Sequence, residues 1–348
     1  MWVVDRLDAD PNGMMGNAMT GSGSLSWCIK QANADADAKN AITNEGITFA
    51  QGLPLDPITN DATITVQQAY NLADPLDNLS ITGNIPVWVQ LDNTQAYQAD
   101  TSVFEVGVNC TVMLQTLTIA FGRANVSGGG GGGAVVNEGL LTLAGCQLKY
   151  DYGTFGGAVW NRPNAVLTVQ GCTFFQNSAN WVNEPGGSTT GSGGAIFSEG
   201  NLSVQTSTFD SNSASSDGGA IAVSCFTNPS VSFNTCKFLS NLALASVGAN
   251  GQGDGNGGAL FLRTIGGGKS VVMQQCTFKG NEAQNNGGGI YLVGGGVLDM
   301  VTMADYSGNV DHINSQQESN LIYAVTDGSS IIDRTGAIQP GDIQDGPP

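Results

Sequence analysis

The chain contains 348 residues, of which 41% are hydrophobic and 11% are charged, and 29 acidic against 11 basic residues give a formal net charge of −18. This acidity argues against nucleic-acid binding, which needs Lys and Arg at the phosphates. It also argues against tight binding of polyanionic polysaccharides, unless divalent cations bridge the two. Fifty glycines would suit a low-complexity chain, but regularly spaced Val, Ile, Leu and Phe supply the burial that disordered segments lack. No run of about 18 apolar residues is present, so no membrane-spanning helix is expected.

The N-terminal segment begins with the apolar stretch WVVDRL, which predicts a strand. The following DADPNG places Asp8, Asp10 and Asn12 as at the start of a calcium-binding loop. The twelfth loop position is Met19 instead of the usual Glu, so an Asx-rich turn explains the same residues. Calcium is therefore the one cofactor that the sequence suggests.

A helix is predicted over 24–38, where Leu25, Trp27 and Ile29 follow Ser24 as an N-cap candidate. This helix precedes most of the predicted strands, so it can cover the open edge of the first coil. An uncovered strand edge would favour aggregation. The first residues lack the basic and apolar parts of a signal peptide. We therefore expect any leader or anchor to lie outside these residues.

The rest of the chain repeats one unit, clearest in GGAIFSEGNLSVQTSTFDSNSA at 193–214. The units open on two glycines and a small apolar pair: GGAV at Gly132 and Gly156, GGAI at Gly193 and Gly218, GGAL at Gly257 and GGGI at Gly287. They close on a Phe-x-x-Asn-x-Ala ending: FFQNSA (174–179), FDSNSA (209–214), FLSNLA (238–243) and FKGNEA (278–283). Such a repeat, with variation confined to one place, predicts a solenoid.

The strands between the turns are short and β-branched, so we expect an all-β fold: a right-handed, single-stranded parallel β-helix of about eight or nine coils with an N-terminal α-helical cap. In such a fold each unit makes one coil, and equivalent residues stack about 4.8 Å apart. The predicted parts are an N-terminal strand and capping helix (1–45), the β-helix (46–308), and a C-terminal closing segment and tail (309–348).

Stacking of the coils predicts columns of like residues inside the solenoid. The first column contains the Phe residues of the endings, Phe174, Phe209, Phe238 and Phe278. The second contains side-chain amides that form hydrogen bonds to the backbone or to one another at a bend. Its members are Asn177, Asn212, Asn241 and Asn281. The third is a column of buried thiols, with disulfides or a metal as alternatives: Cys146, Cys172, Cys236 and Cys276, with Ser207 in the same slot and Cys110 one unit earlier.

The GGA[IVL]…FxxN repeats resemble those of the polymorphic outer-membrane proteins of chlamydiae and related secreted bacterial β-helix proteins. The start, DADPNG…GSLSWCIKQANA followed by GITFA and LSITG, is similar to the SLREA-type segment of large bacterial surface proteins, with SLSWCI in place of SLREAI. Together the two resemblances cover residues 2–305. They imply right-handed β-helix architecture and a secreted or surface location, and the repeat is shared by proteins of many roles.

Catalysis by a glycoside hydrolase would need two carboxylates about 5 to 9.5 Å apart. Glu138 and Glu199 each follow a GGA opening by a few residues, and we expect them two coils, roughly 10 Å, apart. Both precede glycine at a turn, which is also an ordinary surface composition. A lyase would need basic residues at one site, whereas these are scattered, and His312, the one histidine, lies beyond the repeats.

The loops between an ending and the next glycine corner vary most in length, and the long ones lie at 122–131, 180–192 and 244–256. All leave the same corner, so we expect them to line one edge of the solenoid, where repeat proteins often bind ligands. An exposed Trp181 indole would stack on a sugar ring; alternatively, it covers the edge of a coil. The candidate ligand-binding residues are Trp181, Asn183, Glu184 and Asp254.

These features favour a secreted or cell-surface bacterial structural or adhesin-type module without catalysis. One alternative is a carbohydrate-active enzyme, a polysaccharide lyase or glycoside hydrolase, or a glycan-binding module that uses the long-loop edge. Another is a self-assembling filament or surface-layer unit joined end to end through strand edges. The expected partner is a glycan or protein on a host or neighbouring cell, or another copy of the chain; nucleic acid is not expected.

Overall fold

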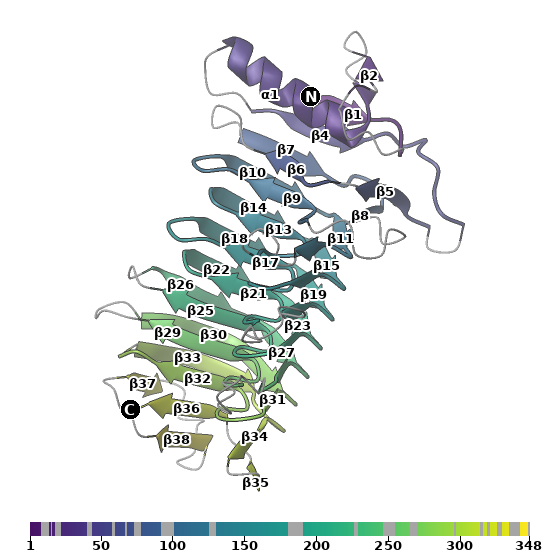
Figure 1. Cartoon of the computed structure of the whole chain (residues 1–348). Helices are drawn as coiled ribbons and strands as arrows, with labels where there is room; N and C mark the ends of the chain where they lie inside the picture. The colour runs from purple at the N-terminus through teal and green to yellow at the C-terminus, as the bar shows by residue number, and fades with distance from the viewer. Residues whose placement is uncertain are drawn as a thin grey trace, which may run out of the picture.

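The computed structural model shows a solenoid of parallel strands, with α1 (Leu25–Lys39) as the one α-helix among the described residues. The chain termini lie at opposite ends of the solenoid, and α1 lies at the N-terminal end (Figure 1). The structure describes residues 1–7, Met14, 16–17, 22–39, 44–57, 60–66, 68–72, 78–91, 101–124, 130–179, 191–225, 229–245, 255–264, 270–295, 297–313, 316–318, 321–325, 329–333 and 342–346.

The N-terminal end contains α1 and three short strands, β1 (Trp2–Val4), β2 (Gly16–Asn17) and β3 (Ser22–Gly23). The helix begins where the sequence predicts, because the Ser24 Oγ accepts a hydrogen bond from the Trp27 backbone N–H at 3.1 Å. The Trp27 ring packs edge-on against Trp2, with ring centroids 5.6 Å apart. The predicted helix is therefore present and packs on the first strand.

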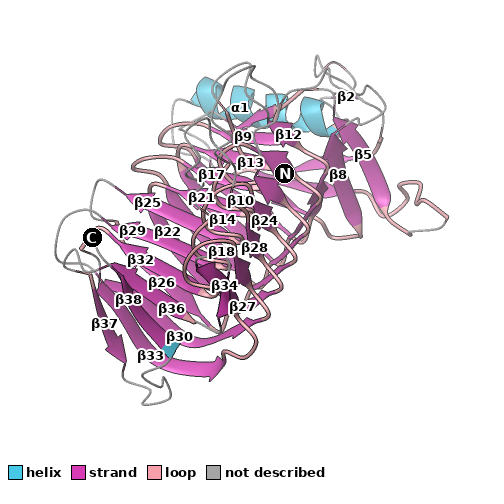
Figure 2. Cartoon of the chain, turned by 60° about the horizontal axis from the view of Figure 1, so that its bottom comes forward, coloured by secondary structure: helices cyan, strands magenta, loops and turns pink. Residues whose placement is uncertain are grey.

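Three long faces of parallel strands form the solenoid, and we name them A, B and C (Figure 2). Face A consists of β4 (Gly46–Phe49), β7 (Asn78–Thr82), β10 (Thr111–Gln115), β14 (Leu140–Ala144), β18 (Val166–Gln170), β22 (Asn201–Gln205), β26 (Val231–Asn234), the first part of β30 (Ser270–Lys279), β33 (Val297–Asp305) and β37 (Ser330–Asp333). Face B consists of β5 (Ala62–Val66), β8 (Val87–Leu91), β11 (Thr118–Ala120), β15 (Gln147–Lys149), β19 (Thr173–Phe175), β23 (Thr208–Asp210), β27 (Lys237–Leu239) and the second part of β30.

Face C is a ten-stranded sheet. It consists of β6 (Tyr70–Leu72), β9 (Phe104–Val106), β13 (Val135–Asn137), β17 (Val159–Asn161), β21 (Ile196–Ser198), β25 (Ile221–Cys225), β29 (Leu260–Thr264), β32 (Ile290–Val293), β36 (Ile322–Val325) and β38 (Ile343–Gly346). Parallel pairing of β36 and β38 carries the solenoid geometry into the predicted closing segment.

A column of short strands lies between faces B and C. It consists of β12 (Arg123–Ala124), β16 (Tyr152–Gly153), β20 (Ser178–Ala179), β24 (Ser213–Ala214), β28 (Leu242–Ala243), β31 (Glu282–Ala283), β34 (Val310–Ile313) and β35 (Gln316–Glu318). All neighbouring pairs are parallel except β34 and β35, which form an antiparallel hairpin in the C-terminal part of the chain. Together with the three faces, this column gives the parallel β-helix that the repeats predict.

The inner face of each strand fills the core, because in-register stacking places like side chains above one another. In β22, Leu202 and Val204 are buried between outward polar neighbours. The predicted phenylalanine column is confirmed, and its centroids are 4.7, 5.1 and 4.7 Å apart along Phe174, Phe209, Phe238 and Phe278. The core is thus one continuous column, with no separate interior for each unit.

The two glycines that open a unit have different roles. Gly193 has a φ of 70°, which favours glycine because it lacks a Cβ. A Cβ on Gly194 would lie 2.0 Å from the carbonyl oxygen of Gly219 in the next coil. The first glycine therefore allows the bend, and the second allows the close approach of two coils.

Two further bends in the coils use left-handed backbone, in most coils at residues other than glycine. Between faces A and B, Thr116, Thr206 and Thr235 have φ values of 51°, 49° and 56°. After face B, Phe121 and Tyr150 both have a φ of 58°. In later coils this second bend is occupied by Gln176, Ser211, Ser240 and Gly280. Bulky aromatic residues are uncommon in this region of φ, so the first two bends differ from the others.

The predicted asparagine column is a continuous amide ladder, and Asn309 extends it. Along Asn177, Asn212, Asn241, Asn281 and Asn309, each Nδ2 donates to the next Oδ1 at 3.0, 3.0, 2.9 and 2.8 Å. Each Oδ1 after the first also accepts a backbone N–H from the preceding coil. Buried backbone groups at the bend are thereby paired across coils.

The predicted cysteine column is present in part. Cys146, Cys172 and Cys236 are buried thiols whose Sγ atoms donate to backbone carbonyls of the preceding coil, the first to Leu114 at 3.2 Å. Cys276 and Ser207 occupy the same slot, by the register of the flanking strands. The placement of Cys110 was wrong: Leu117 occupies the slot, because β11 pairs with β15 at Thr118 and Gln147. Cys110 lies before β10, at the preceding bend.

Asp151 takes the asparagine position at the N-terminal end of the ladder. Its Oδ1 accepts the Gly122 backbone N–H at 2.9 Å, and its own N–H donates to the Asn177 Oδ1 at 3.0 Å. Its Oδ2 is buried without a hydrogen-bond partner among the described residues. Burial raises the pKa of this carboxyl well above its ordinary value of 3.8, and the Gly122 N–H offsets this only in part.

Removal of one ladder amide tests its contribution to stability. We expect Asn212→Ala to lower the free energy of unfolding by about 2–5 kcal/mol. The substitution removes the Oδ1 that accepts from the Asn177 backbone N–H and from Asn177 Nδ2, and the Nδ2 that donates to the Phe174 carbonyl. Urea unfolding followed by circular dichroism measures the change. The outward Ser203→Ala in the same coil is the control, and equal midpoints for the two variants would contradict the ladder's role.

Replacement of the buried acid tests its protonation. Because the pKa of Asp151 is raised in the folded state, its contribution to the free energy of unfolding is greatest below the unfolded pKa, near 3.8. That contribution falls as the pH rises toward the folded pKa. An asparagine carries no such cost and can donate to the Ile119 carbonyl, as Asn177 donates to that of Leu148. We expect Asp151→Asn to raise the free energy of unfolding by about 1–3 kcal/mol at pH 7 and by less at pH 4. An equal gain in the free energy of unfolding at pH 7 and at pH 4 would contradict this explanation.

Candidate ligand-binding site

Glu138 and Glu199 occupy equivalent positions two coils apart, after β13 and β21, and Arg162 takes this position in the coil between them. Arg162 Nη1 pairs with the Glu138 Oε1. Its guanidinium also lies 4.2 Å from the ring centre of Trp160, whose Nε1 donates to the Glu199 Oε2 at 3.0 Å. Arg162 and Trp160 therefore occupy the space that a substrate and its water would need between the two carboxylates.

The remaining predicted site residues are Trp181, Asn183, Glu184, Asp254, Asp8, Asp10 and Asn12, and all lie outside the described residues. In the part of the chain that is described, no three His, Cys, Asp or Glu side chains are grouped to hold a metal ion. His312 lies beside Glu282, with Nε2 and Oε1 2.9 Å apart. The described segments also contain no helix that is long and apolar enough to cross a membrane.

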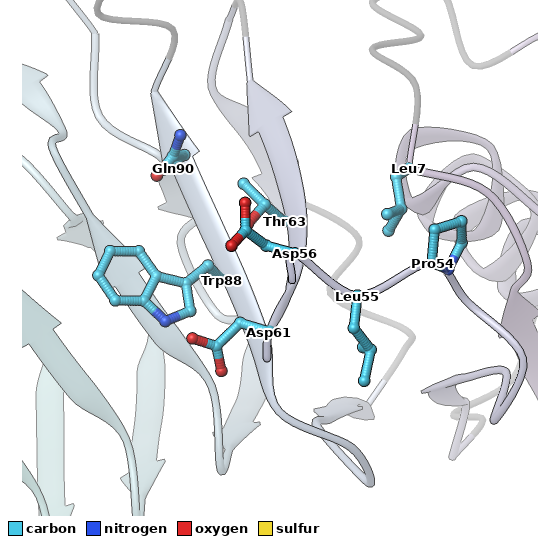
Figure 3. A pocket seen from close by; sticks show the side chains of 8 residues that line it. All are labelled: Leu7, Pro54, Leu55, Asp56, Asp61, Thr63, Trp88 and Gln90. Atoms are coloured by element: carbon cyan, nitrogen blue, oxygen red, sulfur yellow. The ribbon is translucent and has the colours of Figure 1, made fainter. Parts of the chain in front are cut away.

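A pocket opens near the N-terminal end of face B, with a cavity volume of about 520 Å³. Leu7 and the 54–56 segment line one part of it, and outward side chains of β5 and β8 line the other. Figure 3 shows the Asp61 carboxylate directed to the same side of β8 as the Trp88 indole, across from Leu7 and Pro54. The complete lining is Leu7, Pro54, Leu55, Asp56, Asp61, Thr63, Trp88 and Gln90.

Strand alternation explains why the polar and aromatic groups face this pocket. In β8, Trp88 and Gln90 alternate with the buried Val87, Val89 and Leu91. In β5, Thr63 is outward, and it pairs in register with Trp88. Apolar walls with a few polar groups are typical of ligand pockets.

Aromatic rings continue from Trp88 across the next coils, and we name Trp88, Phe121, Tyr150 and Phe175 the aromatic strip. The centroids of Trp88 and Phe121 are 6.3 Å apart, and those of Phe121 and Tyr150 are 5.4 Å apart with nearly parallel planes. Phe175 meets Tyr150 edge-on at 5.8 Å. Tyr150 is 39% exposed, and the other three rings are half-buried. The strip therefore presents apolar ring surface to solvent along face B.

Aromatic residues on the outside of face C are more enclosed. Phe261, Tyr291 and Tyr323 stack at 5.5 and 5.4 Å. Phe261 is only 5% exposed and Tyr323 only 9%. This second column resembles packing of the solenoid's own surface, whereas the aromatic strip leaves ring surface open.

Charges of both signs lie close to Trp88. The Lys149 ammonium lies over its indole, 5.8 Å from the ring centre, which is within the range of a cation–π contact. Asp56 and Asp61 contribute carboxylates to the pocket. The site therefore combines aromatic faces, two carboxylates, a hydroxyl and an amide.

Sequence reasoning did not identify this site. Trp88 precedes the clear repeats, and the strip draws on two different strand positions and one bend position, so no single sequence spacing connects its members. A usable signal was the period of two in VWVQL, which places Trp88 and Gln90 on the outer face.

Comparison with known families identifies the repeats. The model of the Chlamydia polymorphic membrane protein repeat matches residues 171–199, 206–224 and 275–293. Each match includes the asparagine bend and the following glycine pair of one coil. Comparisons with curated proteins and with solved structures give no significant match. This chain is therefore a parallel β-helix protein that carries repeats of the Chlamydia polymorphic membrane protein kind.

Proposed function

We propose that this chain is a surface-displayed, adhesin-type β-helix module that binds a partner without catalysis. The observation that carries the proposal is the match of three coils to a membrane-protein repeat. These coils belong to a solenoid whose inner columns hold it rigid. A rigid solenoid suits this role, because it holds its outer rows at a fixed spacing over many coils.

The arrangement of the carboxylates supports a role without catalysis. Glu138 and Glu199 are the acids that the repeat frame places at matching positions, and each has a partner in the intervening coil. A hydrolase would need one carboxyl held as an acid and the other as a base or nucleophile, with room for the substrate between them. The ion pair and the indole hydrogen bond instead join three coils at their outer edge.

The extracellular location is part of the same proposal. The membrane-protein repeat supports it, and the net charge of −18 suits a soluble outer surface. The partner would be a glycan or a protein on a neighbouring cell. Attachment through exposed outer rows, of which the aromatic strip is one, fits the way repeat proteins bind along an extended surface.

Adhesion and turnover can be measured on the same purified chain. We expect beads that carry the chain to adhere to cultured cells or to glycan-coated surfaces above uncoated beads. In a polysaccharide panel read by reducing ends and unsaturated products, we expect no turnover. Glu138→Gln and Glu199→Gln should change neither readout, and the outward Glu105→Gln of face C is the matched control. Turnover of any polysaccharide in the panel would overturn the non-catalytic role, and adhesion no greater than that of uncoated beads would overturn the adhesive one.

A further inference from the structure

We propose that the pocket at Trp88 and the aromatic strip together bind an uncharged oligosaccharide. The inference rests on the proposed adhesive function and gives it a ligand class and a place on face B. It assigns binding away from the long-loop edge and from the Glu138–Arg162 cluster.

The chemistry of the pocket suits a sugar. Sugar rings have apolar C–H faces that pack on aromatic rings, and hydroxyl edges that need donors and acceptors. The pocket provides both: the Trp88 indole and Leu55 are apolar, and Asp61, Thr63 and Gln90 are polar. A cavity of about 520 Å³ is of the size that small-ligand sites have.

Phe121 and Tyr150 place aromatic rings at a bend of the backbone next to face B. Both have a φ of 58°, in the left-handed region that bulky side chains rarely adopt. The equivalent bend in later coils has Gln176, Ser211 or Ser240. The ring of Tyr150 is outward and 39% exposed, so core packing does not explain it. Phe121 lies next to Trp88 of the pocket, with ring centroids 6.3 Å apart, and Tyr150 stacks on Phe121 at 5.4 Å. The two bend residues therefore continue the aromatic surface that begins in the pocket.

The charges around the pocket select among possible ligands. Asp56 and Asp61 in the pocket, and the net charge of −18, repel an anionic glycan. The Lys149 ammonium already lies over the Trp88 ring, so it repels a second cation at this ring, whereas Asp56 and Asp61 attract a cation elsewhere in the pocket. An uncharged, hydroxyl-rich chain avoids both repulsions.

The length of the strip indicates an oligomer. From Trp88 to Phe175 the strip crosses three coil spacings, about 14 Å. One sugar ring would cover only part of this distance. We therefore expect affinity to rise from monosaccharide to hexasaccharide, with the end residue in the pocket and later residues along Phe121 and Tyr150.

The test is a binding titration of the full chain by calorimetry. The uncharged probes are cellohexaose, maltohexaose and mannohexaose, and the charged probes are a chitosan hexamer and hexagalacturonate. We expect at least one uncharged probe to bind more tightly than both charged probes. We expect Trp88→Ala and Tyr150→Ala each to weaken it by about tenfold, which is the scale of one aromatic contact. Tyr291→Ala, in the stacked column of face C, is the matched control and should leave affinity unchanged.

A loss of binding caused by unfolding is separated from a loss of contact by two measurements. The thermal unfolding midpoint of each variant is compared with that of the parent, and Asp61→Asn provides a variant of nearly unchanged shape. Asp61→Asn should narrow the preference for uncharged over anionic probes, because it removes one repelling charge. Absence of binding to all three uncharged probes, tighter binding of a charged probe, or equal affinity of Trp88→Ala and its parent would each overturn the inference.

The outcome also distinguishes this inference from the adhesive function. If beads adhere to cells and Trp88→Ala leaves adhesion intact, the adhesive function stands and the ligand site does not. If the soluble chain binds an uncharged probe through Trp88 but beads do not adhere, the site stands and the adhesive function does not.

Discussion

The interaction on which the rest of the structure depends is the amide ladder at the bend between faces B and C. Each asparagine amide from Asn177 to Asn281 satisfies the buried backbone of one coil and the amide of the next. No coil completes its own hydrogen bonds, so stability belongs to the stack and not to the unit. Because hydrogen bonds in a dry interior polarise one another, the ladder favours an in-register stack over a shifted one.

This constraint decides where the sequence is free to vary. Inner positions must repeat, because each contacts its counterpart above and below, as the phenylalanine column does. Outer positions and the insertions meet no such requirement. Face B shows the result: the inner side of β8 repeats the apolar pattern of its neighbours, whereas its outer side carries Trp88 and Gln90. Binding groups can therefore be added to the outer rows without disturbing the columns that hold the coils together.

The same division explains what the sequence could predict. Inner columns leave a periodic trace, so the parallel β-helix, the phenylalanine column and the asparagine ladder were predicted residue by residue. Cys110 was misplaced because VNCTVML resembles the thiol slot in composition, whereas the strand register gives that slot to Leu117. The positions of Glu138 and Glu199 followed from the repeat, but Arg162 between them did not enter the prediction. The aromatic strip has no common spacing and becomes visible only when the coils stack.

The aromatic strip is where the solenoid departs from its most stable sequence. Left-handed backbone costs a residue with a side chain roughly 1–2 kcal/mol, and the equivalent bend at the C-terminal end of β30 uses Gly280, which avoids this cost. Stacking of Phe121 on Tyr150 returns about 0.5–1.5 kcal/mol, so the pair roughly offsets the strain of one position and not of two. A surface under selection for stability alone would favour glycine, or a small polar residue, at both bends. The left-handed backbone recurs at this bend in later coils, at Gln176, Ser211 and Ser240, so the bend itself belongs to the fold. What distinguishes Phe121 and Tyr150 is that their rings extend the aromatic surface of Trp88, which fits the proposed ligand site.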